Sequence, residues 1–189
     1  MKLFYEILKI VSILIISVII ILFSASVLMQ NKVTGIILKS LNSNFATKLD
    51  AGSTRLSLLR KFPKASFELK NVLVHSSPDF DKNLFTGINT DTLLYAKSAW
   101  LDFRMTDLLK GQYTFERITI KSGRLNLYTD TGARYNYNVS KPRDKNSPAG
   151  KFSLNLNRIN LSDVDVFYYD LNVRLTVKGN IKNGKFKSR

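Results

Sequence analysis

The stretch Ile118–Tyr128, ITIKSGRLNLY, contains the pattern that decides the fold. Its apolar residues occupy every second position up to Ile120, and the alternation resumes in the opposite phase after Lys121-Ser122. A period of two residues indicates a β-strand with one apolar and one polar face. A two-residue hairpin turn, or a bulge, would keep the apolar residues on one face after the change of phase.

Two other stretches follow the same pattern. FELKNVLVH begins at Phe67 and INLSDVDVFYY begins at Ile159, so the three copies start 51 and 41 residues apart. In each copy, an apolar-x-apolar unit is followed by two polar residues and a second alternation. Because the spacing is unequal, the pattern is either a weak internal repeat or the alternation that any series of β-hairpins shows.

Short alternations, interrupted by turn-forming residues, continue through the rest of the chain and predict a mainly β domain. We expect strands near 47–59, 65–75, 92–105, 113–120, 123–129, 134–139, 151–161, 163–169 and 172–178. One helical turn is expected at Met105–Lys110, and the polar residues 140–150, SKPRDKNSPAG, should form an exposed loop. Nine strands spaced 4.7–4.9 Å apart would give a sheet about 40 Å wide.

Residues Ile10–Met29 form an apolar run without a charged side chain. A helix of this length spans about 30 Å, the thickness of the hydrocarbon core of a bilayer. Lys2 and Lys9 precede the run and Ser24-Ala25-Ser26 supplies small residues, so a cleaved secretory signal is the alternative. Since the apolar region of a signal is usually about 7–15 residues long, we expect residues 1–29 to remain as a cytosolic start and a single transmembrane anchor.

A second helix is predicted at 30–46. Apolar residues recur there at three- and four-residue steps, which is the pattern of one apolar helix face. They are Val33, Ile36, Ile37, Leu41 and Phe45. This connecting helix should lie at the membrane surface or cover one end of the domain formed by residues 47–189.

The formal net charge is +15, and 27 basic and 13 acidic side chains remain once Lys2, Lys9 and Glu6 are set aside with the anchor. The basic residues are dispersed, and no nucleic-acid-binding motif accompanies them. For a membrane-anchored chain, anionic lipid headgroups are the nearest polyanion, and we expect them, rather than nucleic acid, as partners. A basic face that is merely solvated is the alternative.

The chain contains no cysteine and one histidine, His75. A disulfide framework and thiolate metal sites are therefore excluded. A histidine-based triad would have to use His75, and no G-x-S-x-G or other nucleophile motif accompanies it. We expect His75 to be a strand-end residue, and we expect no enzymatic activity, catalytic residue, metal site or cofactor.

Taken in order, these features resemble the N-terminal region of AsmA-family proteins of Gram-negative envelopes, in particular the Bacteroidetes type. The strongest matches are LSLL at 56–59 leading to Phe62-Pro63, the LLKG turn at 108–111, and the GRLNLY stretch at 123–128. The resemblance covers nearly the whole chain and consists of strand and turn patterns. Family members are usually several hundred residues longer, so we expect this sequence to be a fragment or an unusually short member.

The resemblance implies a bacterial inner-membrane anchor, a periplasmic β domain, and membership of the repeating β-groove group of bridge-like lipid transfer proteins. It also implies a role in lipid transport and outer-membrane biogenesis. The fold expected on this basis is a transmembrane helix and an amphipathic helix, followed by a curved antiparallel sheet that forms an open apolar groove.

Alternating apolar residues are the candidates for contact with phospholipid or glycolipid acyl chains in such a groove. They are Phe67, Leu69, Leu101, Phe103, Leu125, Leu127, Leu154, Leu156, Val164 and Val166. The same residues could instead pack against one another, or under the helix at 30–46, as an ordinary core. A second hypothesis is a structural envelope scaffold that binds a protein partner by strand addition at an open sheet edge.

Overall fold

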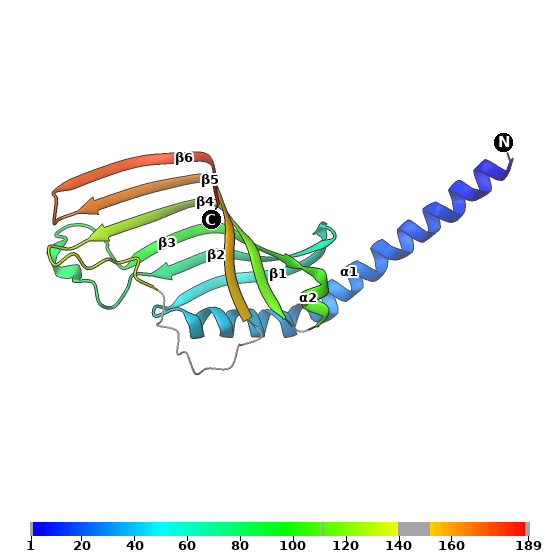
Figure 1. The fold of residues 1–189 in the computed structure, drawn as a ribbon, viewed down its shortest axis with the longest axis horizontal. Helices are drawn as coiled ribbons and strands as arrows, with labels where there is room; N and C mark the ends of the chain where they lie inside the picture. Colours follow the sequence, from blue (N-terminus) through cyan, green and yellow to red (C-terminus); the bar gives the residue numbers. More distant parts are fainter. Residues whose placement is uncertain (1, 111, 140–151, 188–189) are drawn as a thin grey trace.

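A computed structural model describes residues 2–110, 112–139 and 152–187 of the protein. Its longest element is the helix α1, Lys2–Asn44. Figure 1 shows that the first half of α1 projects away from the rest of the molecule and the second half lies along the sheet. The two predicted helices are thus one continuous helix, which ends in the mid-forties as expected. By length and composition α1 is consistent with a single-pass anchor or a signal sequence.

The second half of α1 is fixed to the sheet by its apolar stripe. Val33, Ile37 and Leu41 are buried, and they join one core with residues of the first three strands. Polar contacts reinforce this packing at both ends. Ser26 Oγ accepts a hydrogen bond from the Leu58 backbone N–H at 3.1 Å, and Asn42 Oδ1 accepts one from the Leu49 backbone N–H at 3.0 Å. The predicted amphipathic segment therefore covers one edge of the β domain.

Six strands follow in a single sheet whose spatial order is the chain order. They are β1 (Leu49–Lys61), β2 (Lys64–His75), β3 (Thr92–Arg104), β4 (Tyr113–Thr129), β5 (Phe152–Asp170) and β6 (Leu175–Lys187). A 3₁₀ turn, η1 (Lys82–Leu84), precedes β3, and the short helix α2 (Met105–Leu109) follows it at the expected position. All neighbouring strands pair antiparallel except β4 and β5, which are parallel.

Five of the nine predicted strands are not separate strands in the structure. Residues 113–120 and 123–129 form one strand, β4, and residues 151–161 and 163–169 likewise merge into β5, which begins at Phe152. Residues 134–139 form turns with one isolated bridge between Thr129 and Tyr135. The expected sheet of nine antiparallel strands is therefore a sheet of six long strands, about 24 Å across five spacings. The predicted loop at 140–150 lies outside the described residues.

The changes of phase are a single feature that crosses the whole sheet. Asn71, Ser122 and Asp163 have positive φ angles of 49°, 50° and 56° in the middle of β2, β4 and β5. Strand pairing passes these places without a register shift, as the pairs Lys121↔Ser162 and Gly123↔Val164 show for β4 and β5. No residue is inserted, so these places are neither hairpin turns nor bulges. Neighbouring strands reverse their pleat together along this line.

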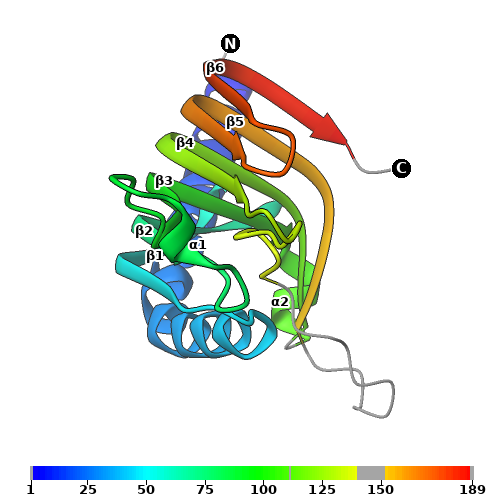
Figure 2. The same ribbon diagram turned by 90° about the vertical axis from the view of Figure 1, so that its left-hand side faces the viewer.

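The pleat reversal keeps one face apolar along the full length of the strands. Figure 2 shows the sheet curling, with β4 and β5 bending strongly along their length and the second half of α1 along the lower side. Left-handed residues within a strand change its direction locally, which accounts for bending at this line. The line also positions Gly123, where a Cβ atom would lie 2.4 Å from the Tyr95 carbonyl oxygen.

A polar network closes the end of the sheet where β2 and β4 terminate. Asn136 is fully buried: its Nδ2 donates to Ser76 Oγ and to the Asn126 carbonyl, and its Oδ1 accepts from the Tyr128 N–H. Asp130, also fully buried, accepts hydrogen bonds from three backbone N–H groups and from the guanidinium of Arg134. Burial favours the neutral carboxyl, but these hydrogen bonds outweigh it and lower the pKa of Asp130.

Candidate functional site

The apolar face of the sheet is built from rows of paired residues that cross all six strands. One row joins Leu56, Phe67, Leu101, Ile118, Ile159 and Phe186 through successive cross-strand pairs. The first three are buried, Ile118 and Ile159 are half-buried, and Phe186 is 51% exposed. The apolar face is therefore a closed core over β1–β3 and becomes progressively uncovered toward β6.

A second row shows the same gradient beyond the pleat reversal. Val74 on β2 is buried, Leu125 on β4 and Val166 on β5 are half-buried, and this row ends at Gly179 on β6. In the next row along the same face, Leu127 pairs with Tyr168, and Tyr168 pairs with Val177, which is 50% exposed. Nothing in the described part of the chain covers the β6 end of these rows.

The ten residues predicted to contact acyl chains divide along this gradient. Phe67, Leu69, Leu101 and Phe103 belong to the closed core near the docked half of α1. Leu125, Leu127 and Val166 are half-buried on β4 and β5, and Val164 is buried in the same sheet face. The side chains of Leu154 and Leu156 lie outside the described residues. Other apolar residues of the same face, which alternation also marks, were not predicted to contact acyl chains: Ile118, Ile120, Ile159, Val177, Ile181 and Phe186.

The sheet has two edges of different character. The β1 edge is covered by the second half of α1, whereas β6 is a terminal strand of thirteen residues with no neighbouring strand beyond it among the described residues. Terminal strands leave backbone N–H and C=O groups available for pairing, and lysine side chains on such strands discourage indiscriminate association. Lys178, Lys182, Lys185 and Lys187 lie on β6.

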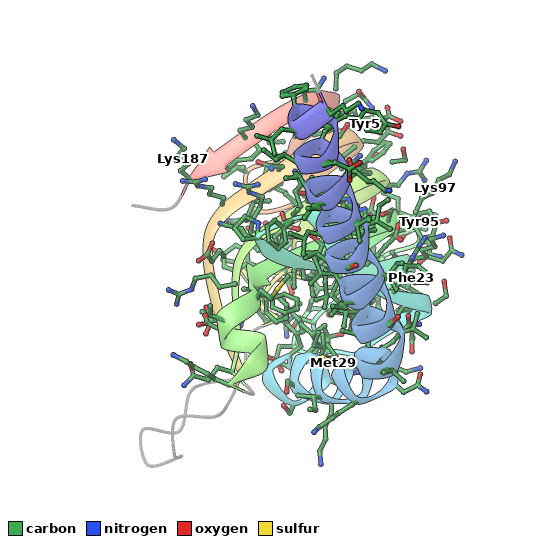
Figure 3. All side chains as sticks on the ribbon, turned by 90° about the vertical axis from the view of Figure 1, so that its right-hand side faces the viewer. Tyr5, Phe23, Met29, Tyr95, Lys97 and Lys187 are labelled. Atoms are coloured by element: carbon green, nitrogen blue, oxygen red, sulfur yellow. The ribbon has the colours of Figure 1, made fainter. Side chains whose placement is uncertain are left out.

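The projecting half of α1 presents apolar side chains on every side. Figure 1 shows this half projecting from the domain, and Figure 3 places Tyr5 near its start, Phe23 further along it and Met29 where the helix meets the domain. The most apolar stretch of this helix is only 6% buried within the molecule. A helix that is apolar all round needs an apolar environment, which a lipid bilayer provides.

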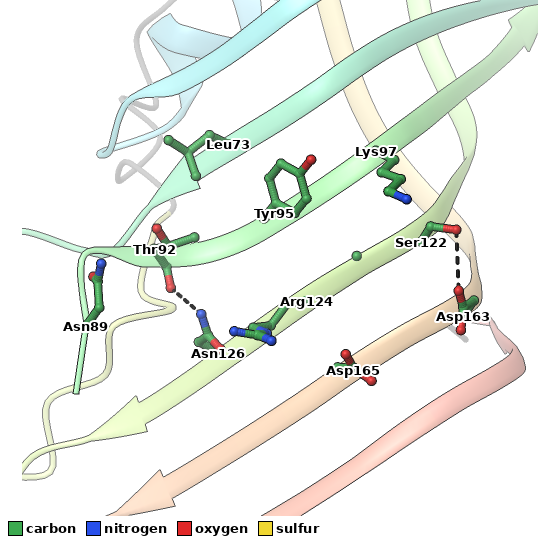
Figure 4. A pocket seen from close by; sticks show the side chains of 11 residues that line it. Leu73, Asn89, Thr92, Tyr95, Lys97, Ser122, Arg124, Asn126, Asp163 and Asp165 are labelled. Carbon is green, nitrogen blue, oxygen red and sulfur yellow. Dashed lines mark hydrogen bonds between the residues drawn. The ribbon is translucent and has the colours of Figure 1, made fainter. Parts of the chain in front are cut away.

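The outer, polar face carries a pocket of about 540 Å³ near the pleat reversal. Figure 4 shows Tyr95, Lys97, Arg124, Asp163 and Asp165 around it, with hydrogen bonds from Ser122 to Asp163 and from Asn126 to the Thr92 carbonyl. Its two cationic and two anionic side chains offset one another.

His75 is the last residue of β2, as expected. Its Nε2 lies 3.1 Å from Asp50 Oδ2, and Lys48 Nζ lies 2.9 Å from the other oxygen of that carboxylate. These contacts, that of Lys48 foremost, lower the pKa of Asp50. Within the described ranges, no group of three or more histidine, cysteine or acidic residues could hold a metal ion.

Comparison of the chain with protein-family models, with curated proteins and with solved structures finds no match in any of the three.

Proposed function

We propose that this protein is an AsmA-like lipid-handling protein of the bacterial envelope, anchored by α1 in the inner membrane with its β domain in the periplasm. In this proposal the apolar face over β4–β6 shields acyl chains from water while phospholipid or glycolipid moves toward the outer membrane. The observation that carries the proposal is the exposure gradient, which leaves apolar side chains uncovered at the β6 end of the face.

Energetics support a transient lipid contact. An apolar face left in water costs about 25 cal/mol per Å² of exposed surface, so uncovered rows of apolar residues favour an apolar occupant. Each CH₂ group buried on protein contributes about 0.8 kcal/mol, but a lipid leaving a bilayer gives up a similar amount. A face of this kind lowers the barrier to transfer without binding lipid tightly, and it needs no catalytic group.

The width of the sheet limits what one molecule can do in this proposal. The six strands together are about 24 Å wide, and a sheet of this width does not reach from one membrane to the other. The proposed role is therefore the membrane-proximal segment of a longer path, continued by strands that pair with β6.

Lipid co-purification tests the proposal. The full chain, extracted in a non-ionic detergent, should retain phospholipid detectable by mass spectrometry. Leu125→Glu places a charge on the half-buried part of the apolar face and should reduce retained lipid at least fivefold. Lys121→Glu, at an exposed position on the same strand but the opposite face, should retain lipid as the unmutated protein does. Absence of lipid from the unmutated protein would reject lipid transfer.

The free β6 edge favours a second candidate, a scaffold that binds an envelope protein by strand addition. This function would depend on the backbone of β6 and would tolerate Leu125→Glu. One stoichiometric protein partner recovered by cross-linking, without retained lipid, would support the scaffold over lipid transfer.

A further inference from the structure

A basic pocket of about 470 Å³ lies on the polar face at the carboxyl end of β6. Five cationic side chains and no acidic side chain line it. The lining residues are Lys61, Arg117, Arg158, Asn160, Lys185, Phe186 and Lys187. Figure 3 shows Lys187 on the opposite side of the domain from Tyr95 and Lys97, so this pocket is distinct from the charge-balanced one in Figure 4.

Strand register assembles most of the basic pocket. Arg117 pairs with Arg158, and Arg158 pairs with Lys187, so three cations lie in one row across β4, β5 and β6. Asn160 and Lys185 form the neighbouring pair on the same face. Residues in these rows were dispersed in the sequence and come together only through pairing.

The tip of the β1–β2 hairpin supplies the fifth cation. The guanidinium of Arg60 lies 3.5 Å from the centre of the Trp100 ring and 3.9 Å from Asp102 Oδ1. These contacts fold the hairpin tip onto the polar face, which brings the adjacent Lys61 to the pocket.

Positive charge in the pocket is only partly compensated. Arg117 Nη1 lies 3.7 Å from Asp102 Oδ2. The same carboxylate also forms an ion pair with Arg60 and accepts a hydrogen bond from Ser66. The other four cations form no ion pair within the described part of the chain, and the nearby Glu116 is paired with Lys64 and Arg104. Arg117 Nε is buried without a hydrogen-bond acceptor among the described residues. An anionic oxygen would satisfy that donor and the surrounding charge.

The basic pocket adjoins the apolar face at the open edge. Phe186 lines the pocket and is also the last member of the apolar row that contains Ile118 and Ile159. Its side chain is half exposed on the terminal strand. A ligand with an anionic group in the pocket could therefore place a hydrocarbon chain across β6 onto the uncovered apolar rows.

We propose that this pocket binds the anionic headgroup of an amphiphile, a phosphate or carboxylate carried by acyl chains, at the edge where lipid meets the apolar face. This inference rests on the proposed lipid-handling function and adds a headgroup preference to it. The interaction is electrostatic, and rising salt weakens it.

Native mass spectrometry of the full chain in a non-ionic detergent tests this headgroup preference, with phosphatidylglycerol, phosphatidylcholine and inorganic phosphate as probes. The unmutated protein should bind phosphatidylglycerol more tightly than phosphatidylcholine. The double variant Arg158→Ala/Lys185→Ala should lose at least tenfold in phosphatidylglycerol affinity and keep its phosphatidylcholine affinity. The matched control Lys70→Ala/Lys97→Ala removes two exposed cations elsewhere on the polar face and should bind as the unmutated protein does.

Three results would overturn the inference. Equal losses in both double variants would show a diffuse charge effect, and no loss in the pocket variant would remove the site. Inorganic phosphate binding as tightly as phosphatidylglycerol would identify a free anion as the ligand instead of an amphiphile. If the pocket variant keeps its headgroup preference while lipid still co-purifies, the headgroup site fails and the proposed function stands.

Discussion

At the scale of single residues, Gly123 is the described glycine of the sheet with the least room for a side chain. A Cβ atom there would lie 2.4 Å from the Tyr95 carbonyl oxygen and 3.1 Å from the Ala96 Cα. Both are backbone atoms of the paired strand and cannot rotate away. Gly123→Ala should lower the free energy of unfolding by about 1–3 kcal/mol. Chemical denaturation of the full chain in detergent measures this change.

Gly179 provides the matched control for this substitution. It lies on β6, and a Cβ atom there would meet no atom within 4 Å. Gly179→Ala should change the free energy of unfolding by less than about 0.5 kcal/mol. Equal stability of the two variants would show that β3 and β4 do not approach as closely as described.

Because of Asp130, the free energy of unfolding of the domain should fall when the pH drops into the acid range. Because its pKa is lowered in the folded state, its contribution is fully present above the unfolded value of about 3.9 and is lost as pH falls through the lowered pKa. Asp130→Asn should cost about 1–3 kcal/mol at pH 7 and should flatten the loss of stability below about pH 4. The exposed Asp79→Asn is the control, and an identical acid profile for the two variants would contradict this role.

The residue pairs at the changes of phase show what sequence can predict at this scale. Lys70-Asn71, Lys121-Ser122 and Ser162-Asp163 marked the correct places, and the second residue of each has a positive φ angle. The expected form, a hairpin turn or a bulge, was wrong. A single strand gives the same pattern whether the chain turns back or reverses its pleat, and only the neighbouring strands decide between them.

At the scale of elements, α1 combines two environments in one helix. Ile37 is fully buried against the sheet, and Ile20 in the projecting half is 59% exposed. Ile37→Ala should lower the unfolding free energy of the β domain by about 2–5 kcal/mol, since it leaves a cavity in the core. Ile20→Ala should leave it unchanged, and similar losses in both variants would show that the projecting half also packs on protein.

Prediction at this scale succeeded where local signals decide the outcome. The end of α1, the positions of β2 and β3, and the turn of helix at Met105 followed from apolar spacing and turn residues. The parallel pairing of β4 with β5 could not be predicted, because alternation is the same in either direction along a strand. That pairing depends on the connection after Thr129, which local propensity does not specify.

At the scale of the whole molecule, the helix and the sheet together create an asymmetric apolar face. The second half of α1 covers the apolar face beside β1. Because the strands follow one another in chain order, β6 lies at the other edge, where the described residues leave the face uncovered. Alternation identified the residues of this face but not their neighbours, so Phe67 and Leu125 looked equivalent in the sequence. The structure separates them, because Phe67 is fully buried in the core that includes the docked half of α1, whereas Leu125 is half-buried at the margin of that core.

Photocrosslinking on β6 tests the central claim that lipid occupies the uncovered apolar face. A benzophenone amino acid replaces Val177 in one protein and Lys178 in another; these adjacent residues are both exposed and alternate between the two faces of the strand. After irradiation of native membranes, mass spectrometry should find lipid adducts at position 177 and few at position 178. Equal labelling at the two positions, or protein adducts alone at 177, would contradict the account.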